Sequence, residues 1–205
     1  MKDLIFDTGL VTYNINGKCE FSFNPTDSAF VEKLFNAFDI LDKKQDAYKA
    51  VFADADSFET VDADADAMQS YLDENGYAAQ SIDETMLAKD ASGNELGYAF
   101  TVTTSEGYGG DIQITVGIMS DGTVNGISFL SISETAGLGM RAKEPSFYNQ
   151  FAGQQAEKFY VSKDGGDGQP IDALSGVTIT SRAVTGAVNT ALGYYQTALG
   201  GSGNE

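Results

Sequence analysis

Residues 112–132 read Ile112-Gln-Ile-Thr-Val-Gly-Ile-Met-Ser-Asp-Gly-Thr-Val-Asn-Gly-Ile-Ser-Phe-Leu-Ser-Ile132, and this stretch decides the fold. Apolar residues alternate with polar or small ones from 112 to 118, which is the pattern of a strand with one covered face. Residues 119–123 predict a turn, and residues 124–132 predict the returning strand. Residues 97–103 predict another strand before this hairpin. We therefore expect an α+β fold in which a twisted antiparallel sheet is packed with helices.

A C-terminal helix is predicted because apolar residues recur there at steps of three and four. They are Val184, Ala187, Val188, Ala191, Leu192, Tyr195 and Leu199. Gly186 and Gly193 lower the helix propensity of this segment, and we expect them to allow close packing against the sheet. The sequence Gly200-Gly-Ser-Gly ends the pattern, so residues 200–205 are predicted to be a disordered tail.

The first 45 residues predict a separate hairpin-helix segment. Strands are expected at 10–15 and 19–23, joined by Asn16-Gly17, a dipeptide that favours a tight turn. A helix is expected next, because residues 25–28 are typical of a helix start and apolar residues then recur at helical spacing. These apolar residues are Phe30, Val31, Leu34, Phe35, Phe38 and Leu41. The polar run 42–46 suggests a boundary near residue 45. We thus expect a segment 1–45 of unclear origin, a fusion or a replaced membrane anchor, and a main domain over 46–199.

The acidic stretch from Ala47 to Leu72 is predicted to be helical, with a solvated acidic face. Its alternating Asp and Ala residues resemble a calcium loop only in part. Counted from Asp62, loop position 6 is Ala67 and position 12 is Asp73, where the EF-hand pattern needs Gly and Glu. We therefore predict no metal site.

Composition excludes several classes of function. The 205 residues carry 12 Lys and Arg against 30 Asp and Glu, a net charge of -18, which disfavours binding to nucleic acid and anionic membranes. One cysteine and no histidine exclude a Cys/His zinc site, a Ser-His-Asp triad and an internal disulfide. No apolar run of about 18 residues and no signal peptide occur, so the chain itself is expected to be soluble and untargeted.

Two segments carry candidate chemistry. Ser175-Gly-Val-Thr-Ile-Thr-Ser181 precedes the C-terminal helix, where free N–H groups and the helix dipole suit a phosphate. Ser and Thr at this place are equally ordinary helix caps, and Arg182 is either a local positive charge or a solvated residue. Ser133-Glu-Thr-Ala-Gly-Leu-Gly-Met140 allows close backbone approach to a ligand, but it lacks the third glycine of a dinucleotide-binding motif.

Together these segments resemble a known family. Asp172-Ala-Leu-Ser-Gly-Val-Thr178 is similar to the flavinylation motif Asp-x-x-Ser/Thr-Gly-Ala-Thr of FMN-binding domains in the G subunit of Rnf complexes and the C subunit of sodium-pumping NADH:quinone reductase. Glu134-Thr-Ala-Gly-Leu-Gly139 resembles that family's Glu-Thr-x-Gly-Leu-Gly. Gly97-Tyr-Ala-Phe100 and Gly107-Tyr-Gly-Gly110 resemble its upstream strand and glycine turn. The resemblance covers about residues 47–199.

The resemblance implies FMN joined by a phosphoester to Thr178, serving as an electron carrier with no catalytic side chain of its own. It places two groups of residues at the cofactor. The ring end comprises Glu134, Thr135, Ala136, Gly137, Leu138 and Gly139, with Gly109 and Gly110; the phosphate end comprises Asp172, Ser175, Gly176, Val177, Thr180 and Ser181. A covalent bond would hold an anionic cofactor despite the charge of -18.

The family also implies partners and a place in the cell. The implied partners are a flavin transferase and other redox subunits. The implied place is the extracytoplasmic face of the membrane, where the domain would be held through its partners or through a missing anchor. Val177 departs from the motif's alanine, which puts acceptance by the transferase in question. Two alternatives are noncovalent FMN and a binding or structural domain in which Ser175 to Thr178 only cap a helix.

Overall fold

The computed structural model describes residues 28–199, and the side chains from Glu32 onward except those of Leu34 and Phe35. The chain divides into two units, Met1–Asp42 and Lys43–Glu205. Helix α1, Ser28–Val51, starts where the sequence indicates and includes the residues of the expected boundary. The hairpin predicted within 10–23 and the tail 200–205 lie outside the described residues.

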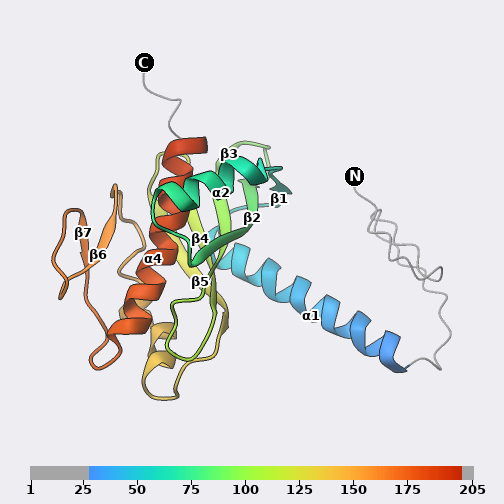
Figure 1. Ribbon diagram of the computed structural model, residues 1–205. Helices are drawn as coiled ribbons and strands as arrows, with labels where there is room; N and C mark the ends of the chain where they lie inside the picture. Colours follow the sequence, from blue (N-terminus) through green and yellow to red (C-terminus); the bar gives the residue numbers. More distant parts are fainter. Residues whose placement is uncertain (1–27, 200–205) are drawn as a thin grey trace. The chain divides into compact units, whose positions relative to one another are not determined.

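The second unit contains a five-stranded antiparallel sheet in the order β1-β2-β3-β4-β5 (Figure 1). The strands are β1 Ser57–Thr60, β2 Gln80–Lys89, β3 Glu95–Thr104, β4 Ile112–Met119 and β5 Val124–Ile132. The predicted strands at 97–103, 112–118 and 124–132 correspond to β3, β4 and β5. The expected α+β class and antiparallel sheet are therefore confirmed.

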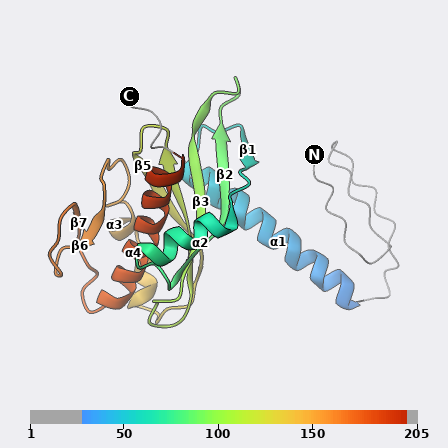
Figure 2. The same ribbon diagram turned by 45° about the horizontal axis from the view of Figure 1, so that its top comes forward.

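Helix α4, Thr178–Tyr194, covers one face of the sheet, and helix α2, Ala65–Glu74, lies beside it. Figure 2 shows both helices on this side. The core between them contains Phe100 and Val102 of β3, which are fully buried, and the apolar side of α4. Burial of one such side chain contributes about 2 kcal/mol, so this layer holds helix α4 firmly on the sheet.

The C-terminal end of α1 covers the other face. Tyr48, Val51 and Phe52 form a second buried cluster there with Ala99 of β3 and neighbouring residues. A Cβ added to Gly117 of β4 would lie 2.8 Å from Cβ of Val51, so glycine at this position allows the helix to approach the sheet.

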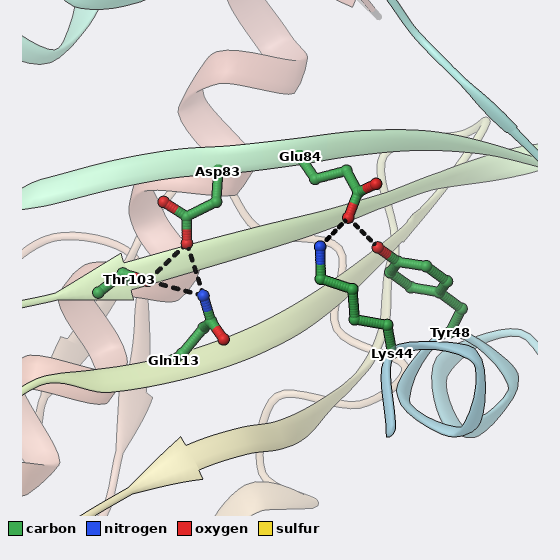
Figure 3. A network of polar contacts seen from close by, with 6 residues as sticks. All are labelled: Lys44, Tyr48, Asp83, Glu84, Thr103 and Gln113. Atoms are coloured by element: carbon green, nitrogen blue, oxygen red, sulfur yellow. Dashed lines mark hydrogen bonds and ion pairs between the residues drawn. The ribbon is translucent and has the colours of Figure 1, made fainter. Parts of the chain in front are cut away.

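Strand β2 is absent from the sequence-based prediction, and a register shift between Ile82 and Glu84 explains why. Because of this bulge, Asp83 and Glu84 point to the same face, and the alternation that reveals a strand is broken. Figure 3 shows both carboxylates turned toward neighbouring elements. Asp83 accepts hydrogen bonds from Thr103 and Gln113 on β3 and β4, while Glu84 accepts from Tyr48 and Lys44 of α1: Lys44 Nζ lies 2.7 Å from Glu84 Oε2.

The prediction of helix throughout 47–72 is wrong over residues 52–64, of which residues 57–60 form the short edge strand β1. Helix α1 ends at Val51, and α2 begins after Asp64, whose carboxylate accepts from the N–H groups of Asp66 and Ala67. The acidic residues here thus serve partly as a helix cap. Within the described residues no cluster of His, Cys, Asp and Glu could hold a metal ion.

The predicted C-terminal helix is confirmed as α4, which ends in a π-helical turn, η2 Tyr195–Leu199. Its two glycines have different neighbours. A Cβ on Gly193 would lie 2.3 Å from the hydroxyl of Tyr71 on α2, so this glycine allows the approach of a helix rather than the sheet. A Cβ on Gly186 would lie 3.3 Å from Nε2 of Gln80 on β2.

Buried tyrosines make the stability of the domain sensitive to alkali. Burial raises the pKa of five tyrosines above the ordinary value of 10: Tyr48, Tyr71, Tyr77, Tyr194 and Tyr195. Since the folded state favours the protonated phenols, their contribution to stability is complete below about pH 10 and is lost as the pH rises beyond it.

We expect the melting temperature to fall steeply above about pH 10. Tyr77→Phe should make the fall shallower, because it removes one phenol whose pKa is raised by burial alone. Thermal unfolding measured from pH 8 to 11, in the parent and this variant, checks the expectation. Identical pH profiles for the two proteins would contradict it.

Candidate functional site

The first turn of helix α4 presents free hydrogen-bond donors. The residue before it, Val177, has no side chain able to cap the helix. In the part of the chain that the structure describes, the N–H groups of Thr178, Ile179 and Thr180 have no protein acceptor. The helix dipole adds partial positive charge at this end. This arrangement suits an anion such as a phosphate.

The hydroxyl of Thr178 is also free. Among the described residues, neither Ser175 nor Thr178 forms a side-chain hydrogen bond. The interpretation of these residues as a helix cap is therefore wrong, because Val177 occupies the cap position and no hydroxyl caps the first turn. Thr178 is half-buried, which leaves its oxygen within reach from solvent.

The turn that leads into the helix is fixed by Ser181. Its hydroxyl accepts from the N–H of Leu174 at 3.1 Å and donates to the carbonyl of Val177 at 2.9 Å. Gly176 within the turn has φ +77°, a conformation that favours glycine. Val177 is only 7 % exposed and belongs to the core. Its extra methyl groups thus pack into the interior.

Asp172, the first residue of the motif, is held at both backbone and side chain. Its backbone N–H donates to Gln150 Oε1 at 2.7 Å, and its carbonyl accepts from Gln150 Nε2 at 3.2 Å. Its carboxylate accepts from the hydroxyl of Ser162 at 3.0 Å. Ser162 follows strand β6, Phe159–Val161, which pairs in parallel with β7, Gln169–Ile171. Gln150 and Ser162 therefore fix Asp172 in place at the start of the segment 172–178.

Glu134 joins the two glycine-containing segments to helix α4. One carboxylate oxygen, Oε1, accepts from the backbone N–H of Tyr108 at 2.8 Å and from the hydroxyl of Thr180 at 2.9 Å. Glu134 is 9 % exposed, and no ion pair within the described residues involves it. The loop 107–110, the loop 133–139 and the start of α4 thus meet at one buried carboxylate.

Two glycines permit this meeting. A Cβ on Gly109 would lie 2.2 Å from the carbonyl oxygen of Ser133, and a Cβ on Gly139 would lie 2.5 Å from Oε2 of Glu134. Both positions need glycine because another chain segment occupies the space of a side chain. Gly139 begins the short helix η1, Gly139–Lys143, which precedes α3, Pro145–Tyr148.

Arg182 does not face the phosphate position as a free charge. Its guanidinium donates to both carboxylate oxygens of Asp164, with Nε at 2.7 Å from Oδ2. This hydrogen bonding lowers the pKa of Asp164 and raises that of Arg182. The free N–H groups of α4 are therefore the better candidates for holding an anion.

The structure brings most of the sequence-predicted residues to this end of α4. Glu134, Gly139, Val177, Thr180 and Ser181 are buried, and Thr178 is half-buried; exposed members are Gly109, Gly110, Thr135, Ala136, Gly137, Leu138, Asp172, Ser175 and Gly176. Sequence reasoning missed Gln150 and the N–H of Tyr108. Neither carries a sequence signal, because one acts through an ordinary surface amide and the other through the backbone.

Part of this chain is similar to known proteins. Residues 107–193 match the family model of the FMN-binding domain. The matched residues include all three segments that meet at Glu134.

By their names, curated relatives of this chain are subunits of ion-translocating complexes. The G subunit of the proton-translocating ferredoxin:NAD(+) oxidoreductase complex of Clostridium ljungdahlii is 42% identical over 97 residues, 47% of this chain and 52% of the relative. The G subunit of the Na(+)-translocating complex of Acetobacterium woodii is 38% identical over 112 residues, 52% of each chain. The chain spans about half the length of these relatives.

The crystal structure of Shewanella oneidensis NqrC is similar over 73% of this chain and 85% of that one, with 21% sequence identity and a TM-score of 0.49.

The helices within the described residues are all too short or too polar to span a membrane.

Proposed function

We propose that this chain is an electron-transfer module whose FMN is joined by a phosphoester to Thr178. The observation that carries the proposal is the free hydroxyl of Thr178 at a helix start whose first N–H groups are also free. The hydroxyl is the acceptor for the bond, and the N–H groups would hold the phosphate oxygens. Once bound, the flavin supplies one- or two-electron transfer.

The fit of the residues to FMN supports the proposal. Thr180 and Ser181 use their hydroxyls to order the site, whereas that of Thr178 remains available. Ester formation replaces the hydrogen of this hydroxyl, so a flavin transferase must deliver FMN from a donor with a leaving group on its phosphate. The net charge of -18 opposes retention of a free anion, and a covalent bond overcomes that opposition.

The names of the relatives support a role within a larger assembly. They are subunits of ferredoxin:NAD(+) oxidoreductase complexes that translocate protons or sodium ions. We infer that this chain exchanges electrons with other redox proteins, as a carrier rather than a stand-alone enzyme. An extracytoplasmic place at a membrane, reached through partners or an anchor, belongs to the same proposal.

Intact-mass measurement tests the covalent bond. After co-expression with a flavin transferase, we expect the parent protein to gain the mass of one FMN less one water. Thr178→Val should abolish the gain, because valine has nearly the shape of threonine but no acceptor oxygen. Thr197→Val is the matched control: it removes a helical hydroxyl that donates to the carbonyl of Gly193, and it should keep the flavin.

The other outcomes discriminate the alternatives. An unmodified parent that is nevertheless yellow, and that loses its colour on denaturation, would show noncovalent FMN. A colourless, unmodified parent would favour the binding or structural domain. Flavin retained in Thr178→Val would place the bond on another residue.

A further inference from the structure

We propose that Glu134 is a positioning residue that sets the place of three apolar side chains, Tyr108, Leu138 and Ile179, against the flavin ring. The inference rests on the proposed function and extends it to Tyr108 and Ile179. Its basis is the convergence of three chain segments on one carboxylate that is almost entirely buried.

The burial of Glu134 points to a role other than stability. A carboxylate with little solvent contact and no cationic partner in the described structure is costly to bury. Hydrogen bonds to the carboxylate offset this cost only where donors reach it. Here the donors come from residues 26 and 46 positions away, so Glu134 fixes distant segments relative to one another.

The three residues lie next to these contacts along the chain. The backbone N–H of Tyr108 donates to Glu134, Ile179 precedes Thr180, and Leu138 precedes Gly139. Their exposures are 71%, 49% and 49%, and they make up half of the large exposed hydrophobic residues in the described structure. The remaining three are Ile40, Leu41 and Met119.

Exposed apolar groups on segments that meet at one point commonly mark a binding site. The occupant proposed here is the isoalloxazine ring, because Ile179 directly follows the acceptor Thr178 and a flat aromatic ring needs apolar surface around it. Without Glu134, the loop that carries Tyr108 would lose its bond to the helix that carries Ile179. The apolar groups would then no longer be held together.

The test uses Thr180→Val and Glu134→Gln, with Thr180→Ser and Glu144→Gln as matched controls. Thr180→Val removes one donor to the carboxylate, whereas serine keeps it. Glu134→Gln keeps the shape and removes the charge. Glu144 is an exposed carboxylate that pairs with Arg141, so its replacement should leave the site unchanged.

Two measurements are made on each protein. Hydrogen exchange of the Tyr108 amide, followed by NMR without flavin, should be faster by about tenfold or more in Glu134→Gln. In flavin-loaded protein, the visible circular dichroism of the flavin should weaken in Thr180→Val and Glu134→Gln but persist in both controls. A folded variant that no longer accepts flavin is scored as a variant with a weakened signal, because Thr178 is then no longer held in place for flavin attachment.

The outcomes separate this role from the proposed function. A loaded parent whose flavin dichroism is the same in all four variants would overturn the role of Glu134 and leave the electron-transfer function intact. A parent that never accepts flavin would overturn the proposed function, and the flavin-positioning role with it, even if the exchange of Tyr108 changes.

Discussion

Asn189→Leu should lower the free energy of unfolding by about 3 kcal/mol, because it leaves buried backbone groups without partners. Asn189 lies within α4 and is 7 % exposed. Its Oδ1 accepts from the N–H of Phe159 at 2.8 Å, and its Nδ2 donates to the carbonyl of Phe159 at 2.9 Å. Phe159 is 1% exposed, so water does not replace these bonds.

Denaturant unfolding measures this loss, with Asn149→Leu as the control. Asn149 is exposed at the end of α3, where the same replacement should change stability by less than about 0.5 kcal/mol. Leucine has the same branching as asparagine, and both variants make the same replacement, so the difference between them reports the buried surroundings of Asn189, including its two hydrogen bonds. Equal stabilities of the two variants would show that β6 does not depend on Asn189.

Gly109→Ala should destabilise the domain by about 2 kcal/mol and strongly reduce flavin loading. The new Cβ would lie 2.2 Å from the carbonyl oxygen of Ser133, a backbone atom directly after strand β5. The loop 107–110 must therefore shift, and the bond from the Tyr108 N–H to Glu134 is lost. Thermal unfolding and the yield of flavinylated protein by intact mass measure both effects.

Gly186→Ala is the same chemical change as Gly109→Ala, but we do not expect it to destabilise the domain. Its Cβ would meet only the ends of two side chains, Gln80 at 3.3 Å and Glu106 at 3.5 Å. Alanine in a helix interior is favoured over glycine by up to about 1 kcal/mol, so this variant should be as stable as the parent or more stable. A loss of stability and flavin as large as that of Gly109→Ala would refute the distinction between them.

The predictable part of the fold is the part in which the sequence pattern or a turn marks the element. Strand β4 follows the period-two pattern, β5 returns from the turn at residues 119–123 despite two register shifts, and α4 follows the helical pattern. Strand β2 escaped prediction because its bulge turns Asp83 and Glu84 to one face. Strand β1 escaped prediction because a four-residue edge strand lies in a stretch rich in Ala and Asp, residue types that are uncommon in strands.

The candidate site divides in the same way. The motif at Asp172 to Thr178 and the segment at Glu134 to Gly139 are visible in the sequence because their residue types are unusual in combination. The bonds that organise them depend on distance in space. Gln150 forms hydrogen bonds with Asp172, and Glu134 accepts hydrogen bonds from Tyr108 and Thr180. Each of these bonds joins residues that are 22 to 46 positions apart. Only the folded chain reveals those connections.

Helix α4 separates two ends of the domain, one at Thr178 and one at Tyr194. From Thr178 to Tyr194 it rises by about 24 Å at 1.5 Å per residue. Electron tunnelling decays steeply with distance, so with the flavin proposed at Thr178 a redox partner would have to approach the end where the helix begins. The opposite end, where the helix finishes at Tyr194, would then be available for other contacts.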